Sequence, residues 1–135
     1  MEKSKEELKA KKIKPSRYRL HILKYLHEKK NHPSADVIYR DIKSQYPYIS
    51  LATIYNTLNI FSRQEIVQSI PGHDKKCHYD ADLSEHYHFI CTECQTIYDL
   101  APQDFPFNFS EHEIQGHEIK KIAAFFTGIC RTCRS

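Results

Sequence analysis

The sequence predicts an α+β protein, in which a winged helix-turn-helix domain is followed by a small α/β domain. Three observations predict this class. In the first half of the chain, apolar residues recur at three- and four-residue steps, as on the buried faces of helices. The period then shortens to two, as in strands, and two Cys-x-x-Cys pairs lie among those strands. We expect residues 1–80 to form the first domain and residues 81–135 the second.

The composition is that of a folded protein in a reducing compartment. Hydrophobic residues make up 40% of the chain, but the longest apolar runs, such as IAAFF, are far too short to span a bilayer. The basic N-terminal segment lacks the apolar stretch of a secretory signal. Paired cysteines in the cytoplasm indicate metal or redox chemistry rather than disulfides. We therefore expect a cytoplasmic protein without a membrane segment.

Three helices are expected before residue 64, and each has a serine at its N-cap position. A first packing helix is followed by two short helices joined by a tight turn, which is the pattern of a helix-turn-helix. The last of the three would be the recognition helix. The expected helices are 17–29, 35–46 and 51–63, capped by Ser16, Ser34 and Ser50.

Five strands are expected after the recognition helix. EIVQSI and KCHYDA flank a Pro-Gly turn, and a hairpin in this position is the wing of a winged helix. HYHFIC, TIYDL and HEIKKIAAFFTGIC follow, with room for a short helix near Ser110 to Gln115. Cys77, in the second wing strand, is expected to be a small buried residue.

The two cysteine pairs are the strongest signal in the sequence. Each spacing of two residues turns both sulfurs toward one point, and two such turns complete a tetrahedral thiolate site. A closed four-sulfur site has no open position, so we expect a structural zinc ion. The alternatives are a thiol–disulfide switch and buried thiols without metal. The cysteines concerned are Cys91, Cys94, Cys130 and Cys133.

Histidines and aspartates near the first cysteine pair predict a second, separate site. His86 and His88 alternate along a strand and so face the same side, whereas Cys91 lies at an odd offset. Asp80 ends the wing and Asp99 ends the next strand. Nitrogen and oxygen ligands suit Fe(II), Mn(II) or Zn(II) better than a thiolate-seeking metal. The alternative is that these are surface histidines without a metal.

These motifs resemble one family over most of the chain. HPSADVIYRDIKSQYPYISLATIYNTL, HYHFICTEC and the distal CRTC resemble the ferric-uptake-regulator (Fur) family of metal-dependent bacterial repressors. The resemblance implies a C-terminal dimerisation domain, a homodimer on double-stranded DNA, and Zn2+ on the four cysteines. It also implies a regulatory Fe2+ or Mn2+, for which Zn2+ can substitute. The matching ligand positions are His32, Asp80, His86, His88 and Asp99.

Two of these positions resemble the peroxide-sensing PerR branch of the family. Asp99 stands where iron-sensing members usually carry glutamate, and Asp80 matches the hinge aspartate of that branch. There, ferrous iron reacts with peroxide and a ligand histidine is oxidised, which implies His32 and His86 as oxidation-sensitive positions. The alternative within the family is an iron or zinc uptake regulator.

The chain departs from the family pattern in two places. Many iron sensors carry an additional site that needs an acidic residue and a histidine where this chain has Tyr87 and Ile122, so we expect that site to be absent. The dimerisation domain usually has a sizeable helix before its last strand, but here the segment is short and contains Pro102 and Pro106.

Candidate DNA contacts fall on and before the recognition helix. Alanine and threonine can touch thymine methyls and asparagine can pair with adenine, which suits an A·T-rich inverted repeat. The candidate base contacts are Ala52, Thr53, Tyr55 and Asn56, with core packing as the alternative for Tyr55. The candidate phosphate contacts, which position without specifying sequence, are Ser50, Arg17, Arg19, Lys9, Lys11, Lys12 and Lys14.

Two other classes compete with a DNA-binding regulator. A non-haem metallo-enzyme could use two histidines and one carboxylate, but five protein ligands leave little room for substrate. A zinc-buffering module would need no helix-turn-helix. The sequence therefore predicts a metal-dependent DNA-binding transcriptional repressor, not an enzyme. The resemblance to the PerR branch implies that it senses peroxide through Fe(II)-catalysed oxidation of a regulatory-site histidine.

Overall fold

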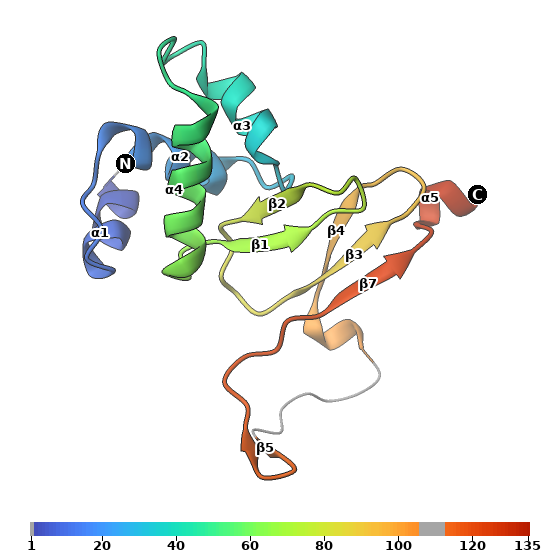
Figure 1. Cartoon of the computed structure of the whole chain (residues 1–135). Helices are drawn as coiled ribbons and strands as arrows, with labels where there is room; N and C mark the ends of the chain where they lie inside the picture. The colour runs from blue at the N-terminus through green and yellow to red at the C-terminus, as the bar shows by residue number, and fades with distance from the viewer. Residues whose placement is uncertain (1, 106–112) are drawn as a thin grey trace. The chain divides into compact units, whose positions relative to one another are not determined.

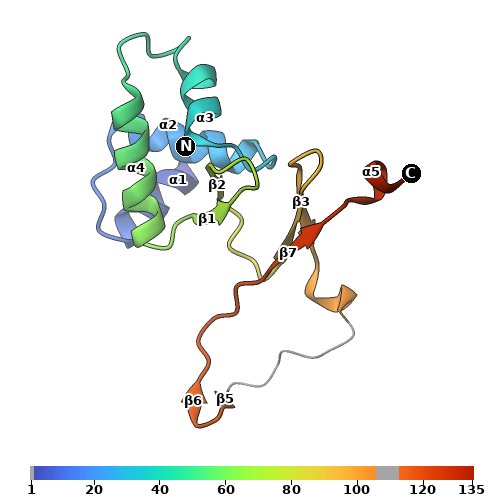
Figure 2. The ribbon, with the colours of Figure 1, turned by 45° about the vertical axis from the view of Figure 1, so that its right-hand side comes forward.

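The fold is α+β, as the sequence predicts. A computed structural model describes residues 2–105 and 113–135. The chain forms two compact units, Met1–Leu83 and Ser84–Ser135 (Figures 1 and 2). The first unit is mainly helical, and the second is built around a small sheet.

The described part of the first unit contains helices followed by one hairpin. Its helices are α1 (Glu2–Ala10), α2 (Arg17–Glu28), α3 (Ala35–Ile42) and α4 (Leu51–Arg63). Its strands are β1 (Gln68–Pro71) and β2 (Cys77–Asp80), which pair antiparallel. A hairpin directly after the recognition helix α4 completes a winged helix-turn-helix.

Serine caps define the starts of two helices. The Ser16 hydroxyl accepts a hydrogen bond from the Arg19 N–H at 3.2 Å, and the Ser50 hydroxyl accepts one from the Thr53 N–H at 3.1 Å. Each bond satisfies a backbone donor that the first turn leaves without a helical partner. Ser34 occupies the same position before α3 but makes no side-chain cap bond.

Two helical elements differ from the predicted ones. Helix α3 ends at Ile42, short of the predicted end, and residues 43–45 form a turn that places the Tyr46 ring 5.2 Å from that of Tyr18. Helix α1 goes beyond the helices that periodicity predicts. Its Leu8 is fully buried and anchors it to the rest of the unit.

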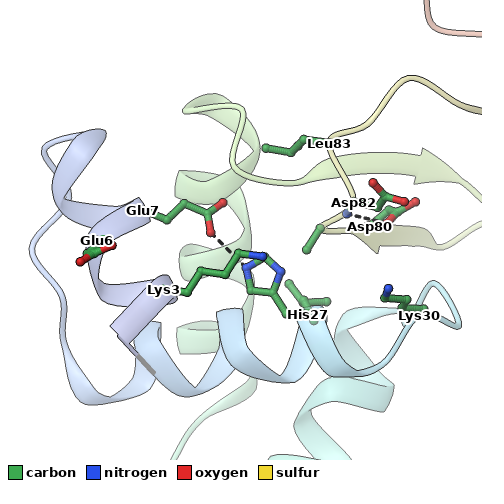
Figure 3. A pocket seen from close by; sticks show the side chains of 10 residues that line it. Lys3, Glu6, Glu7, His27, Lys30, Asp80, Asp82 and Leu83 are labelled. Carbon is green, nitrogen blue, oxygen red and sulfur yellow. Dashed lines mark hydrogen bonds and ion pairs between the residues drawn. The ribbon is translucent and has the colours of Figure 1, made fainter.

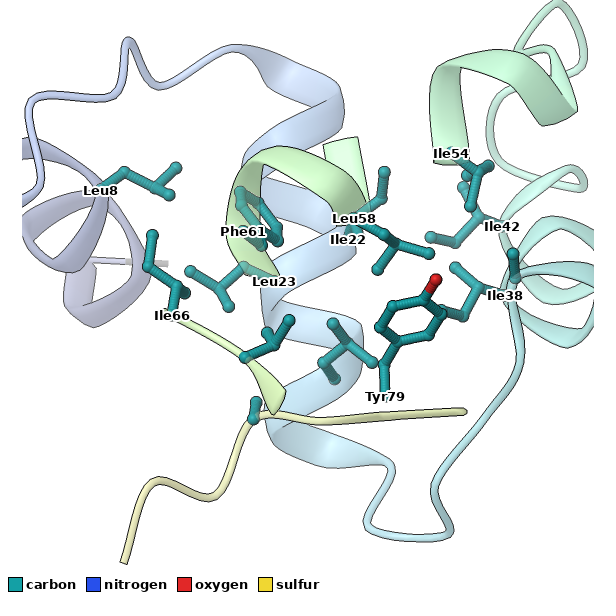
Figure 4. Close-up of a cluster of buried hydrophobic side chains, with 14 of the residues drawn as sticks. Leu8, Ile22, Leu23, Ile38, Ile42, Ile54, Leu58, Phe61, Ile66 and Tyr79 are labelled. Carbon is teal, nitrogen blue, oxygen red and sulfur yellow. The ribbon is translucent and has the colours of Figure 1, made fainter. Parts of the chain in front are cut away.

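The core of the first unit forms where the inner faces of the helices meet the hairpin (Figure 4). Helical spacing places one buried stripe on each helix, and Tyr79 of β2 closes the cluster from below. The fully buried members include Leu8, Ile22, Leu23, Ile38, Ile54, Leu58, Phe61 and Ile66.

The predicted burial of Cys77 is wrong. Cys77 is exposed because it opens β2 beside the wing turn, opposite the exposed Pro71. The buried end of the same strand is Tyr79–Asp80. On β2, therefore, the buried residues lie at the end away from the turn, whereas on β1 the fully buried Ile70 lies beside it.

The second unit is organised around one central strand. Strand β3 (Tyr87–Cys91) pairs antiparallel with β4 (Ile97–Leu100) and parallel with β7 (Phe125–Gly128). The register sets His88 opposite Asp99 on one side. The remaining elements are the 3-10 turn η1 (Pro102–Asp104), the short strands β5 (Glu113–Ile114) and β6 (His117–Glu118), and helix α5 (Arg131–Arg134).

The long final strand predicted over residues 117–130 is wrong. It divides into β6 and β7, and β7 pairs with β3 over only four positions because β3 itself is five residues long. The helix predicted near Ser110 to Gln115 falls partly on residues 110–112, outside the described residues, and Glu113–Ile114 form β5 instead. No helix among the described residues is long and apolar enough to cross a membrane.

Candidate metal centres and nucleic-acid interface

The four cysteines of the second unit converge on one point. The Sγ atoms of Cys91 and Cys133 lie 3.9 Å apart, as do those of Cys94 and Cys130. All four ligand atoms lie within 4.8 Å of one another. Four thiolates at the usual zinc–sulfur distance would be about 3.8 Å apart in a tetrahedron. The donor set therefore fits a closed tetrahedral metal site.

Local donors favour the thiolate form of Cys91 and Cys130, whereas the hydrogen bond with Cys130 raises the pKa of Cys133 to about 12. The N–H groups of Glu93, Cys94 and Cys130 point at the Cys91 sulfur at 3.4, 3.5 and 3.4 Å. The bond from the Cys94 N–H is the largest cause of the lowered pKa of Cys91. A hydrogen bond from the Tyr98 hydroxyl is the main cause that lowers the pKa of Cys130 to about 6. Metals bind the deprotonated thiol, so these contacts favour metal binding at Cys91 and Cys130, and a bound cation would have to displace the proton of Cys133.

A second donor group lies on the same sheet. His86 and His88 both face Asp99, whose Oδ1 lies 3.6 Å from Nε2 of His86 and 3.5 Å from Nε2 of His88. The two imidazole rings lie 4.6 Å apart, as expected for alternate residues on one face. Cys91 belongs instead to the cysteine cluster, so the structure separates the two kinds of ligand.

Burial and tautomer suit the histidines to metal ligation. The side chains of His86 and His88 are 7% and 2% exposed, whereas Asp99 is half exposed. Nδ1 of His86 donates to the Ser84 carbonyl at 2.7 Å, which is possible only when Nδ1 carries the proton. In the neutral ring the lone pair is then on Nε2, toward Asp99.

The remaining two predicted ligands form a pair in the first unit. His32 and Asp80 are 6% and 9% exposed, and Nε2 of His32 lies 3.5 Å from Oδ2 of Asp80. The other carboxylate oxygen of Asp80 accepts the Asp82 N–H at 2.9 Å. The five predicted ligands are thus arranged as a buried pair in one unit and a trio in the other.

The candidate base contacts share the outer face of α4. Ala52, Tyr55 and Asn56 are exposed, and Tyr55 is 42% exposed rather than packed in the core. The hydroxyl of Thr53 lies 2.9 Å from that of Ser50, at the start of the helix. The inner face of α4 is occupied by the fully buried Ile54, Leu58 and Phe61.

The predicted phosphate contacts have different local surroundings. The guanidinium of Arg17 lies 5.3 Å from the ring centre of Tyr46, and Arg19 donates to the Lys14 carbonyl at 2.9 Å. The other basic residues predicted there, Lys9, Lys11, Lys12 and Lys14, are exposed.

One exposed residue beside the recognition helix was not predicted. Tyr48, two residues before Ser50, is 96% exposed. It lies in the turn between α3 and α4, where side chains follow no helical or strand period that would reveal their direction.

A cavity of about 600 Å³ lies in the first unit, between α1, the end of α2 and the residues after β2 (Figure 3). His27 and Glu7 meet across it, with Nε2 and Oε2 3.0 Å apart. Lysines and carboxylates both line it, so it offers no single charge to a ligand. Its lining residues are Lys3, Glu6, Glu7, Leu26, His27, Lys30, Asp80, Ala81, Asp82 and Leu83.

Comparison with known proteins gives one consistent answer. The model of the ferric uptake regulator family matches residues 10–124. The peroxide-responsive repressor PerR of Staphylococcus saprophyticus is 33% identical over 124 residues, which cover 84% of this chain and 77% of that protein.

Solved structures agree with the sequence matches. The peroxide stress regulator of Campylobacter jejuni is 31% identical, with a TM-score of 0.70 over 98% of this chain and 95% of that one. The iron-containing ferric uptake regulator of Francisella tularensis is 25% identical, with a TM-score of 0.70 over 91% and 96% of the two chains.

Proposed function

This chain belongs to the ferric uptake regulator family, and from that premise we propose that it is a metal-dependent, DNA-binding transcriptional repressor that responds to peroxide. One observation carries the proposal. Nitrogen and oxygen donors converge within each unit, on His32 and Asp80 in the first and on His86, His88 and Asp99 in the second. These donors are distinct from the four-cysteine cluster, as a sensing site must be if the structural metal is to stay in place.

We assign Zn2+ to the cysteine cluster, where it would supply a permanent cross-link between β3 and the C-terminal segment. Its ligands would be Cys91, Cys94, Cys130 and Cys133. The near-tetrahedral sulfur spacing and the lowered thiol pKa values of Cys91 and Cys130 support this assignment.

The five nitrogen and oxygen donors would hold one Fe2+ or Mn2+, for which Zn2+ could substitute. Their chemistry suits such ions better than a soft metal. A bound Fe2+ would supply the redox chemistry that activates peroxide. His32 or His86 would take one oxygen atom of the peroxide, and the other oxygen would leave as water. The altered ring is a poorer ligand, so the metal would be released. The restraint that a metal bound to both Asp80 and His86 would place on residues 81–85 would then be lost.

The recognition helix would carry that change to DNA. Ala52, Thr53, Tyr55 and Asn56 lie on the outer side of α4, where they would contact base edges in the major groove. We propose that a homodimer binds an A·T-rich inverted repeat, since each half-site then meets one recognition helix. A coupling of about 1–3 kcal/mol between metal and DNA binding is enough for a useful switch.

Peroxide sensing is favoured over iron or zinc uptake control on two grounds. Both regulatory carboxylates are the shorter aspartate, at Asp80 and Asp99. The relatives named for peroxide response are 33% and 31% identical, above the 25% of the iron-containing regulator. The relatives reported above are named as repressors and regulators, and we propose no catalytic turnover. We place the activity in the cytoplasm, where the thiols stay reduced.

The test is to load the protein anaerobically with Fe(II), add a small dose of peroxide, and map the products by mass spectrometry. We expect a gain of one oxygen on His32 or His86, together with loss of binding to an inverted-repeat DNA. Protein loaded with Mn(II) is the control and should keep both its mass and its DNA binding. Unmodified histidines and unchanged DNA binding in the Fe(II) sample would contradict the proposal.

A further inference from the structure

A histidine that none of the predicted sites includes lies between the wing turn and the candidate ligand His32. His78, in β2, is mostly buried, with 15% of its side chain exposed. Its Nδ1 lies 2.6 Å from the His32 carbonyl oxygen, and its Nε2 lies 2.9 and 3.1 Å from the two carboxylate oxygens of Asp74. Because a carbonyl only accepts, Nδ1 is the donor in the first contact.

The wing turn is built around the pair of Asp74 and His78. A Cβ atom at Gly72 would lie 2.5 Å from Oδ1 of Asp74 and 2.5 Å from Cδ2 of His78, closer than side chains pack. The same Oδ1 accepts the N–H of Lys76 at 3.1 Å. The absence of a side chain at Gly72 thus allows the carboxylate and the imidazole to meet inside the turn.

The backbone around His32 is fixed against the same strand. His32 has a φ of 54°, in the left-handed region, which needs support from its surroundings. Its carbonyl is held by His78, and the next carbonyl, that of Pro33, accepts the Tyr79 N–H at 3.0 Å. Pro33 also restricts the backbone of His32, the residue before it, so holding the carbonyl limits the directions open to the His32 ring, which lies against Asp80.

We propose that His78 is a positioning residue, which orients the proposed regulatory ligand His32 through its backbone carbonyl. Through Asp74, His78 also connects His32 to the tip of the wing. The inference rests on the proposed function, because it concerns a ligand of the proposed regulatory site. His78 itself would not touch the metal. One consequence is that the wing turn, whose tip carries the exposed Lys75 and Lys76, and the metal site share a single chain of contacts.

The test measures Mn(II) affinity of the full-length, zinc-loaded protein from the electron paramagnetic resonance signal of unbound Mn(II). His78→Phe should weaken Mn(II) binding by about ten- to a hundredfold, the usual effect of removing a partner that orients a metal ligand. His73→Phe is the matched control, since His73 is an exposed histidine of the same turn, and it should bind Mn(II) like the wild type.

Two further substitutions separate positioning from a general packing role. Asparagine places its amide nitrogen one bond beyond Cγ, as Nδ1 is, so His78→Asn should keep the donor to His32 and most of the Mn(II) affinity. Glutamine places its amide nitrogen nearer the position of Nε2, so His78→Gln should lose affinity as His78→Phe does. Gly72→Ala should lower Mn(II) affinity with His78 still present, because it forces the pair in the turn apart.

Each remaining outcome is decisive. Unchanged Mn(II) affinity in His78→Phe, while His32→Ala abolishes binding, would overturn the positioning role and leave the proposed function standing. Unchanged affinity in His32→Ala would overturn both. If His78→Phe does not fold, equal affinities of His78→Asn and His78→Gln would reject the inference, and the expected difference between them would support it.

Discussion

The two units of this protein are stabilised by different means. Seventeen buried residues form the apolar core of the helical first unit. Among the described residues of the second unit, the buried apolar side chains are Tyr87, Ile90, Cys91, Ile97 and Cys130, and two of these are cysteines of the candidate zinc site. A core of this size is small for a sheet, and we infer that a metal on the cysteine cluster would supply the stabilisation that apolar burial supplies in the first unit.

The difference matters for the proposed sensing because β3 carries candidate ligands of both centres. His88 and Cys91 lie three residues apart on the central strand, facing different donor groups. A strand held firmly at Cys91 keeps His88 in place whether or not the regulatory site is occupied. Under the proposed function, a metal on the cysteines would therefore hold His88 in position for the regulatory metal.

The largest expected effect tests this division directly. Cys130→Ser should abolish zinc binding and unfold the second unit, because structural zinc contributes on the order of 10 kcal/mol to small domains. Peptide-resolved hydrogen exchange should show lost protection in β3, β4 and β7, with α2 and α4 unchanged. Cys77→Ser, which alters the exposed cysteine outside the cluster, should leave every element protected. Loss of protection in α4 as well would show that the two units do not fold independently.

The complementary experiment truncates a buried apolar side chain of the first unit and leaves the cysteine cluster unchanged. Phe61 is fully buried on α4, so Phe61→Ala should destabilise this unit by about 3–5 kcal/mol through lost transfer energy and a cavity. Denaturant unfolding followed by far-ultraviolet circular dichroism measures the free energy of unfolding of the helical first unit. Zinc content shows whether the second unit stays folded. Tyr48→Ala is the exposed aromatic control and should change stability by less than about 0.5 kcal/mol. Loss of zinc in Phe61→Ala would contradict separate stabilisation.

How far the sequence predicts the molecule also differs between the units. Helix α4 occupies the predicted range, since Ser50 is a strong cap and four buried residues set a clear period. Helix α1 was not expected, because it buries one large apolar residue, Leu8, and a single residue shows no period. Its place depends on the pocket that the other helices provide, which only tertiary structure reveals.

The candidate centres show the same limit. Two local turns of fixed spacing bring four cysteines together, so the sequence alone indicates the cluster. The hydroxyl of Tyr98 on Cys130 depends on the register of β4, and the contact of His78 with Asp74 depends on the space left by Gly72. Sequence patterns therefore find ligands more readily than the groups that orient them.

A smaller effect is expected from Asp99, the half-exposed carboxylate of the proposed regulatory site. Asp99→Ala should remove most of the Mn(II) dependence of DNA binding, a coupling of about 1–3 kcal/mol, because both histidines lose the carboxylate they face. Zinc content and thermal stability should stay at wild-type values, since Asp99 contributes little to the core. Fluorescence anisotropy of labelled inverted-repeat DNA, with and without Mn(II), measures the change. A parallel loss of zinc would mean that the two centres are not separate.

The smallest effect compares two serines within the first unit. Ser16→Ala should cost about 1 kcal/mol, because the Ser16 hydroxyl accepts the Arg19 N–H at the start of α2. Ser34→Ala should cost less, since Ser34 makes no such bond at the start of α3. Denaturant midpoints of the helical signal measure both, and neither should alter zinc content. Equal costs would show that the serine at α3 acts through burial rather than capping, and a change in zinc content would show that the helical unit supports the sheet.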